Sequence, residues 1–156
     1  MCPKCQKPLI VLELDGVELD WCPACRGTWL DTGELELIAE LAGGEREPLH
    51  AALEQPGAAG QRRCPRCRKK MRVVTLHQSS SGSAGHTDPG ATRGAPAASR
   101  VTLAEIDRCP AGDGIWLDAG ELASIVGAYA QHDKAAVARF LGNLFSTSGS
   151  SGPERG

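Results

Sequence analysis

Short apolar stretches predict two hairpins in this chain. Residues 9–14 and 17–21 are mostly apolar and flank Asp15-Gly16, a dipeptide that favours a tight turn between antiparallel strands. Residues 71–76 and 101–108 have the same character, although a much longer segment separates them. We therefore expect two β-hairpins, the second with an extended tip.

Each hairpin is followed by a sequence that predicts an α-helix. A D-x-x-E capping box opens both segments, at Asp31/Glu34 and at Asp118/Glu121. Apolar residues then recur at helical spacing on one face, which comprises Leu35, Ile38, Leu41 and Ala42 in the first segment and Leu122, Ile125, Val126 and Tyr129 in the second. The capping spacing also explains these paired acids without any acid–base chemistry.

The two hairpin–helix segments are similar in sequence. CPKC at Cys2–Cys5 recurs 62 positions later as CPRC at Cys64–Cys67, and CPACRGTWLDTGEL from Cys22 recurs 87 positions later as CPAGDGIWLDAGEL from Cys109. The difference, 87 − 62 = 25 residues, is an insertion in the second hairpin. Its residues 77–99 are rich in Ser, Gly, Ala, Pro and Thr, so we expect them to be disordered.

Composition indicates that the hydrophobic core alone does not stabilise this protein. Aromatic residues make up only 4% of 156 residues, and domains with thin cores usually depend on metals or disulfides. The N-terminus has no signal segment, and no apolar run is long enough to span a bilayer. We therefore expect a cytoplasmic protein, in whose reducing compartment the seven cysteines act as metal ligands.

The first half carries a four-cysteine zinc pattern. Cys2, Cys5, Cys22 and Cys25 read C-x2-C-x16-C-x2-C, in which each two-residue gap lets one tight turn present two thiolates to one ion. Gly27 stands where such a turn often needs positive φ. Four thiolates leave no open coordination position, so this zinc is expected to be structural. The alternatives are iron in a rubredoxin-like electron carrier, or thiols or disulfides without metal.

The second half carries a degenerate version of this pattern. Cys64, Cys67 and Cys109 align with the first three ligands, but Gly112 replaces the fourth cysteine. Asp113 follows directly, and a carboxylate can ligate zinc, so Asp113 is our first candidate for the fourth ligand. Water, no metal at all, or a histidine (His77 or His86) are the alternatives. We expect one zinc firmly and treat a second as tentative.

The cysteine spacing and the WLD-x-GEL tail together resemble the transcription-factor-IIB-type zinc-finger family, in two tandem copies. This resemblance covers about 40 residues in each half, outside the insertion. It implies zinc binding by a ribbon but no particular biochemical activity. Some relatives carry G-H-G in place of the last cysteine, with the histidine as the implied ligand; here that position is Asp113.

The expected fold is a small metal-stabilised α+β protein of two zinc ribbons, each a hairpin with cysteine knuckles followed by a helix. The first ribbon and helix occupy residues 1–44, and a linker, 45–61, is expected to contain a short helix at 48–55. The second ribbon and helix occupy 62–130. A last amphipathic helix spans 131–145, and a disordered tail spans 146–156.

Charge is divided unevenly between the halves. Residues 1–61 hold 4 basic and 11 acidic groups, whereas residues 62–156 hold 13 basic and 8 acidic groups. A dense basic run surrounds the second knuckle and comprises Arg62, Arg63, Arg66, Arg68, Lys69, Lys70 and Arg72. Such a run can bind nucleic acid or a protein partner, can simply be a solvated face, or can dock on the acidic half.

The repeat-matched Trp29 and Trp116 have two interpretations, a recognition surface or, as we favour, a core plug between helix and ribbon. Trp21 has no counterpart and is expected at the periphery. We find no catalytic residue set and expect no small-molecule substrate and no membrane. The sequence therefore favours a zinc-binding interaction module with a protein partner, and nucleic-acid binding in transcription as an alternative.

Overall fold

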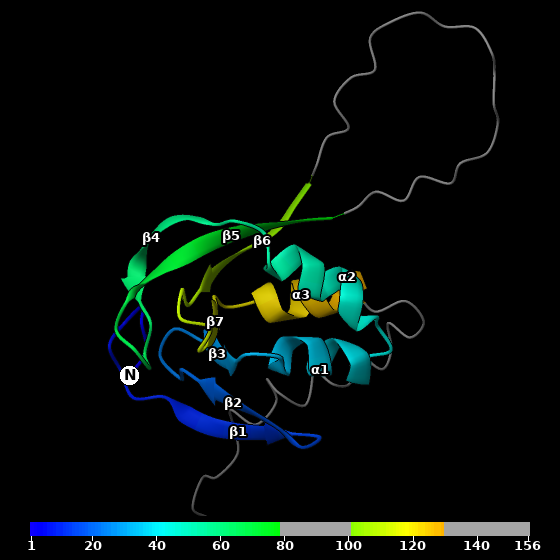
Figure 1. The fold of residues 1–156 in the computed structure, drawn as a ribbon. Coiled ribbons are helices and arrows are strands. Elements are labelled where there is room, and N and C mark those ends of the chain that lie inside the picture. Colours follow the sequence, from blue (N-terminus) through cyan, green and yellow to red (C-terminus); the bar gives the residue numbers. More distant parts are fainter. Residues whose placement is uncertain (79–100, 130–156) are drawn as a thin grey trace, which may run out of the picture.

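Seven strands form one antiparallel sheet in the computed structural model, which describes residues 1–78 and 101–129 (Figure 1). Along the chain the elements are β1 (Ile10–Leu14), β2 (Val17–Trp21), β3 (Thr28–Asp31), α1 (Glu34–Leu41), α2 (Arg46–Leu53), β4 (Ala58–Arg63), β5 (Lys70–Gln78), β6 (Val101–Arg108), β7 (Gly114–Leu117) and α3 (Glu121–Tyr129). The strand order across the sheet is β1-β2-β3-β7-β6-β5-β4. The sheet therefore joins a first half, residues 1–44, to a second half, residues 62–129.

Both predicted hairpins are present. β1 and β2 pair through a turn at Asp15 (φ 49°) and Gly16 (φ 84°), the conformation that the Asp-Gly sequence favours. β5 pairs with β6 from Arg72 opposite Arg108 to Gln78 opposite Val101. His77 and Gln78, the first two residues of the segment that we expected to be disordered, thus belong to β5. The rest of that segment lies outside the described residues.

The two halves are joined by pairing of β3 with β7. Trp29 lies opposite Trp116, and Leu30 lies opposite Ile115. Each of these short strands would otherwise be an edge with unpaired backbone groups, which the mutual pairing satisfies. The small metal-binding α+β class is as expected, but the strands form one larger sheet with three described helices rather than two plainly separate ribbon–helix units.

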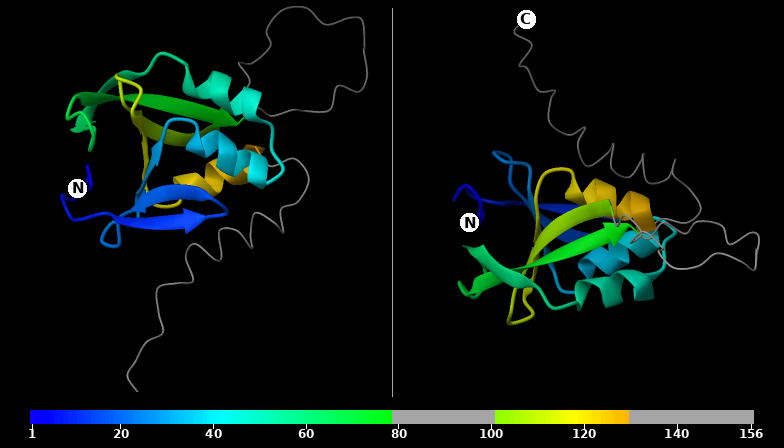
Figure 2. Two further views of the ribbon diagram at one scale, coloured as in Figure 1. Left: turned by 60° about the horizontal axis from the view of Figure 1, so that its bottom comes forward. Right: turned by 90° about the horizontal axis from the view of Figure 1, so that it is seen from above.

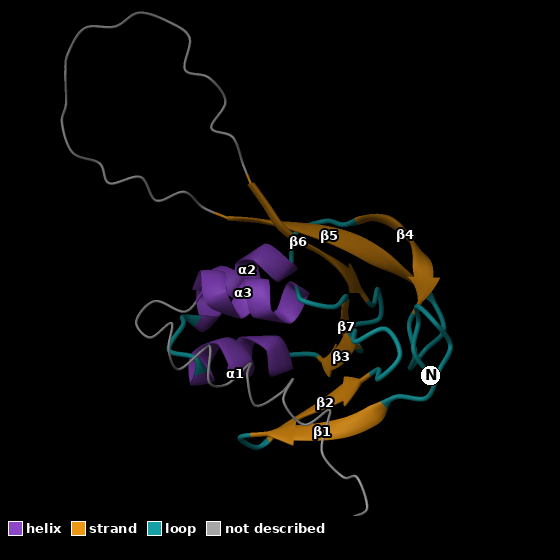
Figure 3. Ribbon diagram, turned by 180° about the vertical axis from the view of Figure 1, so that it is seen from behind, coloured by secondary structure: helices purple, strands orange, loops and turns teal. Residues whose placement is uncertain are grey.

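The three described helices lie together on the concave side of the curved sheet (Figure 3). One hydrophobic cluster unites them with strands of both halves and includes Leu19, Leu30, Leu35, Ile38, Leu49, Leu53, Ile106, Leu117, Leu122, Ile125 and Val126. Burying each Leu or Ile side chain contributes about 1.5–3 kcal/mol. Because this core is shared, the stability of one half depends on the other.

The predicted linker contributes to the folded unit. It contains α2, whose Leu49 and Leu53 are buried, and the first part of β4, which pairs with β5 at the edge of the sheet. The helix begins at Arg46, two residues before the expected start. The predicted helix at 131–145 and the predicted tail at 146–156 lie outside the described residues.

The predicted capping boxes are half right. Glu34 accepts a hydrogen bond from the Asp31 backbone N–H at 2.7 Å, and Glu121 does the same for Asp118. No side chain caps α1, whose N-cap residue is Gly33. The Asp31 and Asp118 carboxylates instead accept hydrogen bonds from tryptophan side chains, as described below.

Candidate metal centres

The four cysteines of the first half meet at one end of the sheet. Cys2 and Cys5 come from the N-terminal loop, and Cys22 and Cys25 from the loop between β2 and β3. The cysteine loops of both halves gather at the end of the molecule opposite the helices (Figure 2). All four sulfurs lie within 4.8 Å of one another.

The spacing of these sulfurs fits a single zinc ion. The Cys2 and Cys25 sulfurs are 3.5 Å apart, as are those of Cys5 and Cys22. Four sulfurs at 2.3 Å from one zinc in a tetrahedron would be separated by about 3.8 Å. The Lys4 and Cys5 backbone N–H groups point at the Cys2 sulfur, at 3.4 Å each, and would stabilise its thiolate form.

Each CxxC turn is closed by backbone hydrogen bonds and a residue with positive φ. In the first half these residues are Gln6 and Arg26, both at φ 58°. The expectation that Gly27 supplies the positive φ is wrong. Gly27 is needed for a different reason, because a Cβ there would overlap the ring of Trp116.

The second cluster brings together Cys64, Cys67, Cys109 and Asp113. One ligand atom from each lies within 4.8 Å of all the others. The Asp113 Oδ2 is 3.1 Å from the Cys109 sulfur and 3.4 Å from the Cys64 sulfur, while the Cys67 and Cys109 sulfurs are 3.4 Å apart. The carboxylate thus stands where a fourth thiolate would be, and the donor set fits zinc.

A change of loop geometry allows Asp113 to reach this place. In the first half Arg26 N–H donates to the Cys22 carbonyl, closing the turn over four residues. In the second half Gly112 donates to the Cys109 carbonyl and has φ 80°. The residue with positive φ in the second half is therefore Gly112, one aligned position earlier than Arg26 in the first half. The side chain of the next residue, Asp113, then points toward the three cysteines. His77 lies exposed on β5, and His86 lies outside the described residues.

Burial disfavours ionisation of two of the thiols in the absence of metal. It raises the pKa of Cys2 and of Cys64 to about 12 in each case. Zinc binding must therefore displace protons, which makes the affinity fall as the pH is lowered. Hydrogen bonds from Cys67 and Cys109 hold the pKa of Asp113 below its usual value, so this carboxylate is already a charged ligand.

Two tryptophans connect the metal centres. Trp29 and Trp116 are 1% and 0% exposed and form one buried cluster with Met71 and the cysteines of both sites. Gly27 makes room for the Trp116 ring, and Gly114 makes room for the Trp29 ring. Each ring thus packs on a glycine of the other half. The core interpretation of these residues holds, although they lie between the two cysteine clusters.

Polar contacts also cross between the halves. Trp29 Nε1 donates to Asp31 at 2.8 Å, and Arg66 of the second knuckle bonds the same carboxylate at 3.2 Å. The matching Trp116 Nε1 donates to Asp118 at 3.3 Å, and Lys4 of the first knuckle bonds that carboxylate at 3.1 Å. Sequence reasoning missed these pairs, although the offsets of 62 (Lys4 to Arg66) and 87 (Asp31 to Asp118) relate them.

The basic run is divided by these contacts. Arg62 lies between Asp107 and Asp118, at 2.6 and 2.9 Å, and Arg66 also reaches Asp20 at 3.4 Å. Arg66 therefore docks on the acidic half, as one of the interpretations predicted, whereas Arg62 pairs with acidic residues of its own half. The other five are exposed and form no ion pair with an acid in the described ranges: Arg63, Arg68, Lys69, Lys70 and Arg72.

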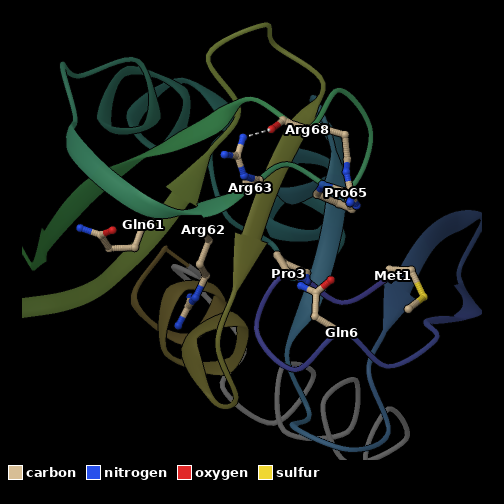
Figure 4. A pocket seen from close by; sticks show the side chains of 8 residues that line it. All are labelled: Met1, Pro3, Gln6, Gln61, Arg62, Arg63, Pro65 and Arg68. Atoms are coloured by element: carbon tan, nitrogen blue, oxygen red, sulfur yellow. Dashed lines mark hydrogen bonds between the residues drawn. The ribbon is translucent and has the colours of Figure 1, made fainter.

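A shallow cavity of about 260 Å³ lies between the two knuckle loops (Figure 4). It is lined by Met1, Pro3, Gln6, Gln61, Arg62, Arg63, Pro65 and Arg68. The Arg63 guanidinium donates a hydrogen bond to the Arg68 backbone carbonyl at 3.1 Å. The charge of Arg62 is neutralised by two aspartates, whereas Arg63 and Arg68, which also line the cavity, form no ion pair among the described residues.

One comparison with known proteins gave a match, and it concerns the first half. Residues 1–41 match the family model described as transcription factor zinc-finger, of the zinc-ribbon type. No curated protein and no solved structure matches the chain significantly. Among the described residues, no helix is long and apolar enough to cross a membrane. The family match and the two four-ligand clusters together support zinc as the metal of this protein.

Proposed function

We propose that this protein is a zinc-stabilised interaction module whose basic knuckle surface binds an acidic segment of a partner protein. The second half is, in this proposal, a degenerate copy of the zinc ribbon, with Asp113 completing its site. The observation that carries the proposal is that four potential protein ligands converge in each cluster. A zinc without an open position cannot bind and polarise a substrate, so its role is structural and we propose no enzymatic activity.

The exposed part of the basic run is the proposed binding surface. Arg68, Lys69 and Lys70 lie on one knuckle loop and its adjoining strand, and no described acid neutralises them. Each cluster carries a net charge of −2 once zinc is bound, which offsets part of the positive electrostatic potential of these basic residues. A protein partner is favoured over nucleic acid because Trp29 and Trp116, the aromatic residues that pack beside the cysteines of the knuckles, are buried and cannot stack on bases.

Binding measurements can separate the two kinds of partner. A labelled polyglutamate peptide and single- and double-stranded oligonucleotides would be titrated with the zinc-loaded protein at several salt concentrations. We expect peptide binding that Arg68→Glu/Lys69→Glu/Lys70→Glu abolishes. The matched control, Lys7→Glu/Arg26→Glu, reverses exposed charges of the first half and should bind as the native chain does. Tighter oligonucleotide binding with a steep salt dependence would overturn the protein-partner proposal.

Metal dependence is the second part of this test. A chelator should abolish peptide binding, because the knuckle that presents the basic residues unfolds without its ion. The purified protein should be colourless and contain between one and two zinc per chain. A red protein containing iron would favour the rubredoxin-like alternative. We place the protein in the cytoplasm, where its seven free thiols remain reduced.

A further inference from the structure

An apolar face of β1 and β2 is incompletely covered by the described residues. Ile10 and Trp21 are paired across the two strands, and Leu12 follows on the same face. Ile10 is 44% exposed, and the other two are only partly buried. The Trp21 Nε1 is buried and has no hydrogen-bond acceptor within residues 1–78 and 101–129. An unsatisfied buried N–H is rare in folded proteins, so a missing acceptor is indicated.

The corresponding face of the second half is covered by α2. Val74, the counterpart of Leu12 (12 + 62), is 1% exposed. Arg108, the counterpart of Trp21 (21 + 87), donates to the carbonyl oxygens of Leu53 and Gln55 at the C-terminal end of α2. Helix ends leave such carbonyls without partners in the helix. One short helix therefore both covers this face and provides acceptors for the side chain beside it.

A sequence similar to α2 follows α3. Residues 134–141, KAAVARFL, align with residues 46–53, REPLHAAL, at an offset of 88. The two buried residues of α2, Leu49 and Leu53, align with Val137 and Leu141. Four residues, 42–45, connect α1 to α2, and four residues, 130–133, separate α3 from Lys134. The chain after α3 thus has the length that a matching placement requires.

The side chains between these helices have changed together. α2 is held on α1 by an ion pair between His50 and the largely buried Glu36, at 3.0 Å. The counterparts are Ala138 (50 + 88) and Ala123 (36 + 87), two small apolar residues. Replacing only the histidine would leave a buried carboxylate without its partner, and replacing only the glutamate would leave the histidine unpaired. The joint replacement avoids this mismatch and fits a placement of residues 134–141 against α3.

We propose that residues 134–141 form a helix that docks on β1, β2 and α3, as α2 docks on β5 and α1. Val137 and Leu141 then cover Leu12 and Ile10, and the Trp21 indole donates to a carbonyl at the C-terminal end of this helix. The basis is the repeated sequence together with the unpaired Trp21 Nε1. This docking is independent of the partner proposed above, because it uses the opposite half of the sheet.

Trp21 fluorescence in the full-length protein tests this docking. Trp29 and Trp116 are buried, so the Trp21 signal can be obtained as the difference between each variant and the same variant carrying Trp21→Phe. Val137→Asp and Leu141→Asp should each shift Trp21 emission to the red and raise its quenching by acrylamide several-fold. Ala135→Asp is the matched control, because its counterpart Glu47 is exposed on α2. It should leave the emission unchanged.

Zinc content, measured on every variant, shows whether the fold has survived. Unchanged Trp21 emission in Val137→Asp and Leu141→Asp, at normal zinc content, would overturn the proposal. Equal red shifts in all three variants would do so as well, because the effect would not depend on the apolar face. A native Trp21 signal that changes on dilution, with a dimer in sedimentation, would assign the covering role to a second copy of the chain instead.

Discussion

The two cysteine clusters are built alike except at their fourth ligand, and this difference isolates the contribution of one residue. In both, a CxxC turn precedes the hairpin and a second loop follows it, and a buried tryptophan packs with the cysteines. The first has Cys25, whereas the second has Gly112 and Asp113. A shifted left-handed residue moves a carboxylate to the vacant corner of the tetrahedron. A ligand can therefore change in chemistry and in chain position while the architecture is retained.

The exchange is expected to lower metal affinity. A carboxylate is a harder donor than a thiolate, and zinc in a three-sulfur, one-oxygen site should dissociate more readily. The two centres are nevertheless coupled through the Trp29–Trp116 cluster and the shared core. Variants of each centre and of the shared core can separate local metal affinity from the stability of the whole fold.

The largest effect is expected from removing a ligand of the first centre. Cys22→Ser should abolish zinc binding there and unfold both halves, because structural zinc contributes about 10–16 kcal/mol, as much as the whole stability of a small domain. Circular dichroism and zinc analysis would measure this. Pro23→Ala, on the same loop but outside the ligand set, is the control and should keep its metal. Survival of the second half alone would show that the centres are independent.

Loss of the second centre should have a smaller effect. Asp113→Ala is expected to release one zinc, whereas Asp113→His should retain it, because imidazole also binds zinc. In the native protein a chelator titration should proceed in two steps, the second centre first. Retention of both zinc ions with unchanged affinity in Asp113→Ala would show that Asp113 is no ligand.

Restoring a cysteine should not simply reverse this difference. Gly112→Cys places a thiolate at the position of Cys25, but Gly112 has φ 80°, which a side chain adopts only with strain. We expect the two chelator steps to move closer without merging. A single merged step would indicate that the loop changes to the conformation of the first half.

Contacts between the halves can be tested at a glycine. Gly27→Ala would press a methyl group into the Trp116 ring, and overpacking of this kind costs about 1–3 kcal/mol. The midpoint of urea unfolding should fall accordingly. Gly127→Ala, in α3 with open space around it, is the contrasting control and should stabilise by about 0.4–1 kcal/mol. An equal response of the two variants would argue against the packing of Trp116 on Gly27.

The smallest effect concerns the ion pair between α1 and α2. A hydrogen bond to Glu36 raises the pKa of His50, so the folded protein binds this proton more tightly than the unfolded chain. The stabilisation is full below the unfolded pKa of about 6.5 and is lost as the pH rises through the raised folded value. Unfolding midpoints of the native protein and Glu36→Gln should therefore differ more at pH 6 than at pH 8. A difference independent of pH would show that the pair is not ionic.

Local features of this protein were determined by its sequence. The Asp15-Gly16 turn, the hairpins, and the helices after each WLD-x-GEL segment follow from turn chemistry, apolar periodicity and capping, which act over a few residues. Cysteine spacing likewise predicted which ligands come together, because a CxxC turn is itself a local structure. Asp113 was a candidate for the same reason, as the nearest donor to the missing thiol.

Only the tertiary structure decided how the halves combine. Three kinds of contact join residues of the two halves that are far apart in sequence: the pairing of β3 with β7, the placement of each tryptophan on the other half's glycine, and the ion pairs of Lys4 with Asp118 and of Arg66 with Asp31. No local pattern encodes such contacts, because they depend on which strand edges and charges meet after both halves have formed. The same reason explains why Gly27 was assigned to the wrong constraint: a ring from the distant β7 occupies the space beside it.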